Sequence, residues 1–238
     1  MNARRHRTTC VVPAAVLLLL AAPSWGSGAG AQSPQAPHDA TAHHPFTDVE
    51  KWKQIFDDPR RDEWQKPKQV VEALGLSPGG IVADLGAGTG YFERYLSKAV
   101  SPGGIVLAID TEPAMVRQLA ERALKEGTAN VVPVLALPQE PFLPPGRVDR
   151  VLIVDTYHHV DDRIRYFRRL GDLLAPGGRI AIVDFHKRPL PVGPPPEHKL
   201  SREFVLDEMK QAGYRLSDEK TFLPYHYFLI FERGAPAC

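Results

Sequence analysis

The feature that most constrains the fold of this chain is the stretch at residues 82–92, which reads VADLGAGTGYF. A short apolar run at residues 81–83 leads to Asp84, and three glycines then alternate with other residues before a helical pattern begins near Tyr91. This order predicts a buried strand, a tight loop and a helix. The glycines are Gly86, Gly88 and Gly90. Because glycine tolerates positive φ and has no Cβ, such a loop lets a ligand lie against the main chain, so we expect a nucleotide pocket here.

The spacing of these glycines distinguishes two classes of nucleotide pocket. Dinucleotide-binding loops read G-x-G-x-x-G/A, with a small third residue that lets the helix pack closely beneath a pyrophosphate. Here Tyr91 stands at that third position, where its ring would crowd a pyrophosphate, and Asp84 would repel one. A carboxylate before the first glycine suits a ligand that carries an ammonium group. The spacing therefore disfavours a nicotinamide-dependent oxidoreductase.

The sequence DLGAGTG resembles motif I of the class I S-adenosylmethionine-dependent methyltransferases. The resemblance implies that S-adenosylmethionine is the cofactor and that the glycine loop approaches its methionine and ribose parts. The loop residues concerned are Gly86, Ala87, Gly88 and Gly90. The resemblance also implies that Asp84 faces the amino-acid end of the cofactor.

A second carboxylate is expected at the end of the next strand. After a helix predicted at residues 93–100, an apolar strand at residues 105–109 runs into Asp110, twenty positions after Gly90, and Thr111 follows. At this separation the tip of the second strand places a carboxylate where it can bind the two hydroxyls of a ribose. Asp110 and Thr111 are therefore predicted to contact the adenosine part of the ligand, a feature that dehydrogenases share.

The third contact with the cofactor is expected after the next helix and strand, at residues 113–126 and 130–135. The resemblance implies an acid or amide beside the adenine amino group in the loop that follows, which reads ALPQEPFLPPG. No aspartate occupies the expected place, and the nearest substitutes are Gln139 and Glu140. These two residues are the predicted adenine contacts.

Polar residues follow the strand predicted at residues 148–154, which is nearly continuous in aliphatic residues, as in a strand covered on both faces. Open parallel sheets bind ligands at the carboxyl ends of their strands, and this strand ends in Asp155, with His158 and His159 shortly after. The segment resembles the strand-four motif of small-molecule methyltransferases, which implies that Asp155 and a following histidine line the transfer site. Asp155 is thus a candidate both for catalysis and for contact with the cofactor. A histidine can accept a proton from an attacking group, so His158 or His159 is a candidate general base. At least one of the two is expected to serve a structural role.

Nine histidines also raise the question of a metal site. The doublets His43-His44 and His158-His159 lie in loop or extended segments, where adjacent side chains point to different sides. Neither a Cys-x-x-Cys nor a His-x-x-x-His pattern accompanies them. We therefore expect no dedicated metal.

The C-terminal half of the chain completes the predicted sheet. A helix at residues 162–174 precedes a strand at 179–185, and a helix at 201–212 precedes two strands at 214–222 and 226–233. The connection between the last two strands is short, so they must be antiparallel. The prediction is an α/β fold, namely a Rossmann-like seven-stranded mixed sheet with helices on both faces and an antiparallel last strand. The resemblance covers residues 67–233.

Three further features of these elements can be predicted. The core candidates in the helix at residues 113–126 are Met115, Leu119 and Leu124. The arginines of the helix at residues 162–174 are expected on its solvated side. They are Arg163, Arg165, Arg168 and Arg169. The proline-rich segment at residues 186–198 follows a strand at its carboxyl end, and loops of this length often act as lids.

The N-terminal part of the chain predicts export. Three arginines in the first seven residues precede an apolar run at residues 11–22 and the sequence Ala-Gly-Ala at residues 29–31, which together are typical of a cleaved signal peptide at residues 1–31. The apolar run is too short to span a bilayer comfortably, although an uncleaved membrane anchor is an alternative. Residues 32–44 lack large apolar side chains and are predicted to form a disordered linker. The expected location is the periplasm or the medium, without stable membrane insertion after cleavage.

The domain organisation follows from these boundaries. Residues 45–76 are predicted to form an N-terminal helical cap, with one helix before residues 57–59 and another from Pro67, and residues 77–238 form the methyltransferase domain. In related methyltransferases such a leading segment folds over the cofactor pocket. Its candidate rim residues are Arg60, Arg61 and Trp64.

Charge and cysteine content limit the partners of the processed chain. Cleavage after residue 31 would remove three of 29 basic residues and leave 26 against 28 acidic ones, so no nucleic-acid partner is expected. Only Cys238 would remain, which excludes an internal disulfide. The prediction is therefore an exported methyltransferase of a small-molecule substrate, with a non-catalytic binder of S-adenosylmethionine or another adenosine ligand as the alternative. The sequence names neither the methylated atom nor the oligomeric state.

Overall fold

The computed structural model describes residues 47–234, which belong to the second of the two units, 1–36 and 37–238, into which the chain divides. The signal peptide predicted at residues 1–31 and the linker at residues 32–44 lie outside the described residues, as do His43 and His44. Within residues 47–234, no helix combines the length and the apolar character needed to cross a bilayer.

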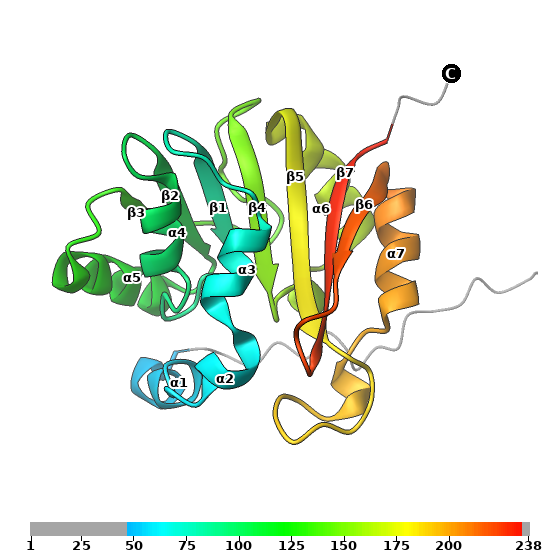
Figure 1. The fold of residues 1–238 in the computed structure, drawn as a ribbon, viewed down its shortest axis with the longest axis horizontal. Coiled ribbons are helices and arrows are strands. Elements are labelled where there is room, and N and C mark those ends of the chain that lie inside the picture. Colours follow the sequence, from blue (N-terminus) through cyan, green and yellow to red (C-terminus); the bar gives the residue numbers. More distant parts are fainter. Residues whose placement is uncertain (1–46, 235–238) are drawn as a thin grey trace, which may run out of the picture. The chain divides into compact units, whose positions relative to one another are not determined.

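Seven strands of the described region form one mixed sheet. They are β1 (Ile81–Leu85), β2 (Ile105–Asp110), β3 (Val131–Leu135), β4 (Val148–Val154), β5 (Leu174–Phe185), β6 (Tyr214–Lys220) and β7 (His226–Arg233). Their order is β3-β2-β1-β4-β5-β7-β6 (Figure 1). The first five strands pair in parallel, and β7 lies antiparallel between β5 and β6. The predicted mixed sheet with its reversed last strand is confirmed.

Helices cover both faces of this sheet (Figure 1). The α-helices are α1 (Val49–Phe56), α2 (Arg61–Gln65), α3 (Pro67–Ala73), α4 (Glu93–Val100), α5 (Pro113–Glu126), α6 (Arg163–Leu170) and α7 (Arg202–Gln211). Successive residues of a strand face opposite sides, so Val151 and Ile153 of β4 join a core with α6 and α7. Leu152 and Val154 join a second core with α3 and α4. The two cores hold the strand ends in place from both faces.

The predicted boundary between the helix at residues 162–174 and its following strand is wrong. The helix α6 ends at Leu170, a 3-10 turn η3 (Gly171–Leu173) follows, and β5 begins at Leu174 instead of residue 179. Leu174 pairs with Val148, whereas the next paired position is Arg179. The residues between them bulge from the sheet, so the Ala-Pro-Gly-Gly segment belongs to the strand and does not close the helix.

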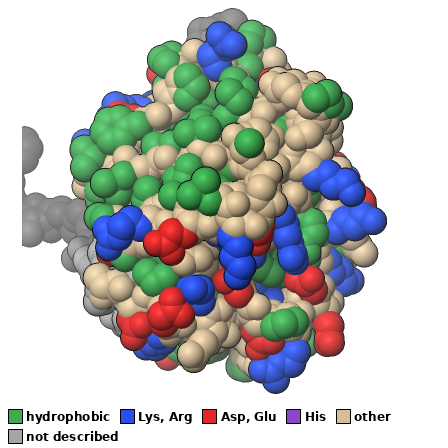
Figure 2. All heavy atoms as spheres, turned by 90° about the vertical axis from the view of Figure 1, so that its left-hand side faces the viewer, with side chains coloured by type: hydrophobic (Ala, Val, Ile, Leu, Met, Phe, Trp, Pro, Cys, Tyr) green, Lys and Arg blue, Asp and Glu red, His purple; other side chains and the backbone are tan. Residues whose placement is uncertain are grey.

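The edge of the sheet at β3 and the neighbouring α5 expose apolar side chains (Figure 2). The exposed fraction of Leu124 is 85%, so its predicted place in the core is wrong, while Met115 and Leu119 are buried as predicted. Leu124 lies five positions after Leu119, and at 3.6 residues per turn this offset rotates its side chain by about 140° around the helix axis. That offset turns Leu124 away from the sheet.

The arginines of α6 divide into one buried and three exposed side chains. The exposed ones are Arg165, Arg168 and Arg169, as predicted. Arg163 is buried, and its Nε donates to Oε2 of Glu208 on α7 over 2.7 Å. Its predicted place on the solvated side is wrong, because a charge can be buried when it is paired.

Polar contacts join the cap, residues 47–76, to the rest of the fold. Asp57 accepts hydrogen bonds from Oγ1 of Thr89 over 2.9 Å and from the guanidinium of Arg122 over 2.8 Å. Lys66 donates to the carbonyl oxygen of Phe222 over 2.8 Å. The helices α1 and α3 were predicted, whereas the short α2 between them was not.

Candidate functional site

The glycine loop, residues 86–90, connects β1 to α4. Gly86, Gly88 and Gly90 have φ values of 81°, 56° and 87°. A Cβ on Gly86 would lie 2.4 Å from the side chain of Thr156, and one on Gly90 would lie 3.0 Å from that of Leu119. The loop is therefore pressed against the segment after β4 on one side and α5 on the other, and its backbone requires glycine. Gly90 faces α5 and does not line the cavity described next.

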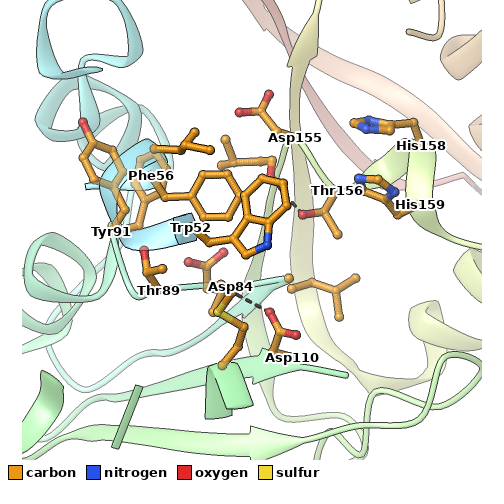
Figure 3. Close-up of a pocket in the computed structure, with 18 of the residues that line it drawn as sticks. Trp52, Phe56, Asp84, Thr89, Tyr91, Asp110, Asp155, Thr156, His158 and His159 are labelled. Carbon is orange, nitrogen blue, oxygen red and sulfur yellow. Dashed lines mark hydrogen bonds between the residues drawn. The ribbon is translucent and has the colours of Figure 1, made fainter. Parts of the chain in front are cut away.

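A cavity of about 1340 Å³ opens in front of the glycine loop. Its walls are the loop, the ends of β1, β2 and β4, the cap helices α1 and α2, and the segment after β5. Figure 3 shows Asp84 and Asp110 on one side of this cavity and Asp155, His158 and His159 on another. The predicted site residues that line it are Asp84, Gly86, Ala87, Gly88, Asp110, Thr111, Asp155, His158 and His159. Residues from distant parts of the sequence thus share one cavity.

The two predicted adenine contacts lie outside the cavity wall. Gln139 is exposed to solvent, and Glu140 forms an ion pair with Arg169 of α6. A β-bridge between Leu137 and Glu140 closes a tight turn that carries both residues away from the wall, which Leu137 still lines. The structure therefore gives no support to Gln139 and Glu140 as cofactor contacts.

Asp110 is held by the backbone at the end of β2. Its Oδ2 accepts a hydrogen bond from the N–H of Gly88 and its Oδ1 accepts one from the N–H of Glu112, each over 2.9 Å. Burial raises the pKa of Asp110, and these backbone donors oppose that shift. The carboxylate is thereby oriented beside the glycine loop, at the place predicted for a ribose diol.

Asp84 lies at the end of β1 with a second buried carboxyl behind it. Both Asp84 and Glu93, the first residue of α4, are 3% exposed. Burial raises the pKa of Asp84 to about 7, and the charge of Asp110 adds to this effect, whereas Glu93 and Arg61 oppose it. The pKa of Glu93 is also raised well above its ordinary value, first by burial and then by the charge of Asp84. The base of the cavity therefore favours a positively charged ligand.

Asp155 occupies a strained position at the end of β4, with φ of 52°. Its Oδ1 lies 3.0 Å from Nε2 of His226 on β7, and its Oδ2 lies 3.4 Å from the guanidinium of Arg61 on α2. Trp64 stacks on the His226 ring at 5.6 Å between centroids. Burial opposes ionisation of Asp155, but His226 and Arg61 outweigh it and lower its pKa. Asp155 is therefore a fixed, ionised carboxylate on the cavity wall.

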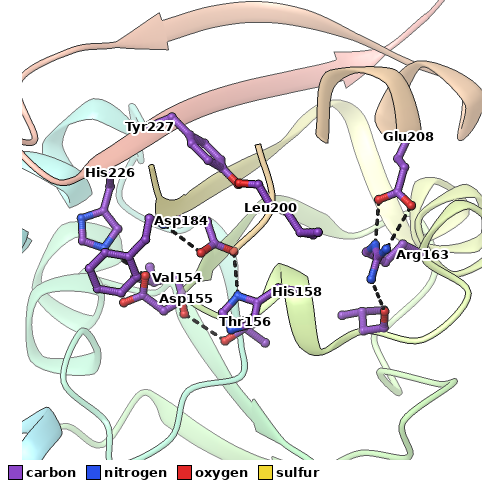
Figure 4. Close-up of polar contacts among 12 residues, drawn as sticks. Val154, Asp155, Thr156, His158, Arg163, Asp184, Leu200, Glu208, His226 and Tyr227 are labelled. Carbon is purple, nitrogen blue, oxygen red and sulfur yellow. Dashed lines mark hydrogen bonds and ion pairs between the residues drawn. The ribbon is translucent and has the colours of Figure 1, made fainter. Parts of the chain in front are cut away.

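His158 forms a second buried pair with a carboxylate (Figure 4). Its Nδ1 lies 2.9 Å from Oδ2 of Asp184 on β5, and both side chains are buried. Burial lowers the pKa of His158, but the charge and hydrogen bond of Asp184 outweigh it and raise the pKa. The neighbouring ring of His159 lies 4.1 Å away and also lines the cavity. A histidine oriented in this way can hold or accept a proton at the cavity.

The side of the cavity opposite the sheet is largely aromatic. Trp52 and Phe56 of α1 stack at 5.1 Å, and the guanidinium of Arg61 lies 4.4 Å from the centre of the Tyr91 ring. All three candidate rim residues, Arg60, Arg61 and Trp64, line the cavity. This wall therefore combines aromatic rings with charged side chains, a mixture that suits an organic molecule with polar groups.

The proline-rich segment after β5 contributes the remaining wall. Residues 191–194 line the cavity, together with His198 of the 3-10 turn η4 (Pro196–His198). Gly193 has φ of 84°, and a Cβ there would lie 2.6 Å from the ring of Phe185. At the base of the segment, the buried Lys199 donates to the carbonyl oxygen of Arg188 over 3.0 Å. The predicted lid is therefore packed on the end of β5.

Within residues 47–234, no group of three or more histidines, cysteines, aspartates and glutamates is arranged to hold a metal ion. Two histidines near the cavity end of the sheet each pair with one carboxylate, His158 with Asp184 and His226 with Asp155. Asp184 and His226 were not among the predicted site residues, since only strand pairing brings them to the cavity end of the sheet.

Comparisons with known proteins agree on one type of domain. The family model described as a methyltransferase domain matches residues 83–180. The crystal structure of an S-adenosylmethionine-dependent methyltransferase from Aquifex aeolicus is 32% identical and has a TM-score of 0.73; the match covers 77% of this chain and 97% of that one.

Two curated relatives are larger than the part that matches. Erythromycin 3''-O-methyltransferase of Saccharopolyspora erythraea is 27% identical, over 74% of this chain and 64% of the relative. Phosphoethanolamine N-methyltransferase 1 of Triticum aestivum is 30% identical, over 67% of this chain and 30% of the relative. The chain thus spans less than two thirds of the length of either protein.

Proposed function

Because this chain belongs to the class I S-adenosylmethionine-dependent methyltransferases, we propose that it methylates a small organic acceptor at the cavity in front of the glycine loop. S-adenosylmethionine is its cofactor. The observation that carries the proposal is that one cavity is lined both by the glycine loop and by the polar residues after β4. A cofactor and an acceptor could therefore meet within it.

The residues on the β1–β2 side fit this cofactor. Gly86 and Gly88 carry no side chain and line the cavity, and Asp110 offers a carboxylate that two backbone N–H groups already orient. Burial raises the pKa of Asp84 in the ligand-free protein, and a bound cation would stabilise the ionised carboxylate that burial disfavours. Asp84 therefore fits a place beside the positive charge of the cofactor. When bound, S-adenosylmethionine would supply a methyl group from a positively charged sulfur: the acceptor atom would bond to the methyl carbon as the carbon–sulfur bond breaks, and S-adenosylhomocysteine would leave.

The residues after β4 fit a role in orienting the acceptor and moving its proton. Methyl transfer requires mainly an in-line nucleophile, so positioning is the first task of these side chains. His158, oriented by Asp184, is the candidate general base, and Asp155 is a candidate hydrogen-bond acceptor for an acceptor hydroxyl or amine. His159 lines the same wall. The aromatic cap would cover an apolar part of the acceptor.

Small-molecule acceptors are supported by the curated relatives. One of them is named for methylation of oxygen in erythromycin and the other for methylation of nitrogen in phosphoethanolamine. The cavity volume of about 1340 Å³ has room for a small molecule beside a nucleotide-sized cofactor. We therefore propose a small-molecule acceptor and leave the methylated atom open.

We also propose that this activity operates outside the cytoplasm. The support is the predicted signal peptide at residues 1–31, with its arginines, apolar run and Ala-Gly-Ala sequence. Cell fractionation with N-terminal sequencing of the processed chain tests this placement, and a chain that retains Met1 in the cytoplasm would contradict it.

The function is tested with radiolabelled cofactor. Purified protein should retain the label from S-adenosylmethionine and transfer it to a compound in an extract of the compartment where the protein resides. Retention of the cofactor without any labelled product would favour the non-catalytic binder. Binding of NAD in place of S-adenosylmethionine would favour the oxidoreductase.

A further inference from the structure

Glu93 is a buried carboxyl that the proposed reaction does not use. It begins α4 directly behind the glycine loop, where its Oε2 lies 3.3 Å from the place that a Cβ on Gly90 would occupy. Within residues 47–234, no hydrogen bond of ordinary geometry reaches either oxygen of Glu93, which is 3% exposed. A charged carboxylate at this depth would be costly, so the side chain requires either a proton or a partner.

The charged groups around Glu93 indicate that it carries a proton. Asp84 is the neighbouring group that acts on it most strongly, and Arg122 acts from the side of α5 with a smaller, opposite effect. Asp84 in turn faces Glu93, Asp110 and Arg61. Two buried carboxyls that interact cannot both ionise readily. Asp84 lines the cavity, where a cation can reach it, whereas both oxygens of Glu93 are buried behind the loop without a hydrogen-bond donor among the described residues, so the proton belongs on Glu93.

We propose that Glu93 is a positioning residue whose neutral carboxyl donates a hydrogen bond to the Asp84 carboxylate and holds it toward the positive charge of the cofactor. Asp84 lines the cavity, whereas Glu93 lies behind it. The inference deepens the proposed function and rests on S-adenosylmethionine being bound in this cavity.

The arrangement links cofactor binding to a proton. In the ligand-free protein the pKa of Asp84 is about 7, so below neutral pH most molecules carry a proton on this side chain. A bound cation stabilises the ionised form and expels that proton, while Glu93 keeps its own. Cofactor affinity should therefore fall as the pH falls below about 7, and at pH 6 binding should release close to one proton.

Two substitutions of Glu93 distinguish a role as a neutral hydrogen-bond donor from a role as a charged carboxylate. Glu93→Gln keeps a donor of the same size without a charge, whereas Glu93→Leu removes the donor. We expect Glu93→Gln to bind S-adenosylmethionine within about threefold of the wild-type affinity, and Glu93→Leu to bind about 10- to 100-fold more weakly. In Glu93→Leu the loss of affinity on acidification should also begin at a higher pH, because Asp84 has lost a donor that lowers its pKa.

The experiment is isothermal titration calorimetry of the full chain with S-adenosylmethionine. Titrations at pH 6 and 8, each in two buffers of different ionisation enthalpy, give both the affinity and the number of protons released. Glu203→Gln is the matched control, because it makes the same change on a side chain that is 76% exposed on α7. The control should match the wild type in both measurements.

The outcomes distinguish this proposal from the proposed function. An equal, tenfold or greater loss in Glu93→Gln and Glu93→Leu would mean that Glu93 acts as a charge and would overturn the proposal, as would wild-type binding without proton release at pH 6. If Glu93→Leu does not fold, the affinity of Glu93→Gln decides by itself. Absence of binding by the folded wild-type chain would overturn the proposed function and this inference together.

Discussion

Replacing Gly86 with alanine should damage both the stability and the cofactor site, for a reason visible in the loop geometry. The new Cβ would lie 2.4 Å from both Cγ2 and Oγ1 of Thr156, at a φ of 81°. The left-handed backbone alone costs a residue with a Cβ about 1–2 kcal/mol. Relief of the overlap must move Thr156 or the loop, and overpacking of this kind costs a further ~1–3 kcal/mol. We expect the free energy of unfolding to fall by about 2–5 kcal/mol.

Gly79 offers a matched control for the backbone contribution. Its φ is 84°, and a Cβ there would meet no atom within 4 Å. Gly79→Ala should therefore cost only about 1–2 kcal/mol and leave cofactor affinity unchanged. Thr156→Ala in the Gly86→Ala background removes the two atoms at 2.4 Å but keeps a Cβ at 2.9 Å, so it should restore part of the loss.

Urea unfolding of the four variants, with calorimetric titration of S-adenosylmethionine, measures both effects. The fourth variant is Thr156→Ala alone, which completes the double-mutant cycle. Equal losses of stability in Gly79→Ala and Gly86→Ala would refute the steric argument. A cycle without coupling between Gly86 and Thr156 would refute it as well.

Three other substitutions test the remaining wall of the cavity. Asp184→Asn removes the charge that raises the pKa of His158. Turnover should fall, and the acidic limb of the plot of kcat/KM against pH should move to lower pH. An unmoved limb would contradict the role of His158 as the base. Burial raises the pKa of Asp84 above its unfolded value, so this group disfavours folding increasingly as pH rises from about 4 to 7. Asp84→Asn should therefore stabilise the ligand-free protein at pH 8 by about 1–4 kcal/mol, measured by urea unfolding. The same variant should bind the cofactor more weakly in calorimetry. In Gly193→Ala the new Cβ would lie 2.6 Å from the ring of Phe185, so the proline-rich segment should move away from that ring. This change should raise the KM for the acceptor more than the Kd of the cofactor. Equal changes in the two constants would refute a lid role.

Local patterns along the chain were sufficient for much of this fold. The strand, glycine loop and helix around Asp84 follow from residues adjacent in sequence, as does the carboxylate of Asp110 at the end of β2. Both carboxylates line the cavity, although their contacts with the cofactor stay predictions. The predicted boundary between α6 and β5 was wrong because the local sequence there is compatible with two structures. The Ala-Pro-Gly-Gly segment could end a helix or bulge from a strand, and pairing with β4 selected the bulge.

The sequence by itself determined the order of strands, helices and the glycine loop along the chain, because hydrophobic periodicity and glycine spacing are local properties. Only the tertiary structure decided which polar side chains meet. His158 pairs with Asp184 across 26 positions and His226 with Asp155 across 71, and both pairs exist because β5 lies between β4 and β7. The buried Asp84–Glu93 pair depends on the depth at which α4 packs, since the same two carboxyls in water would not share an environment. Proton affinities at this site therefore follow from burial and neighbours, which no local pattern encodes.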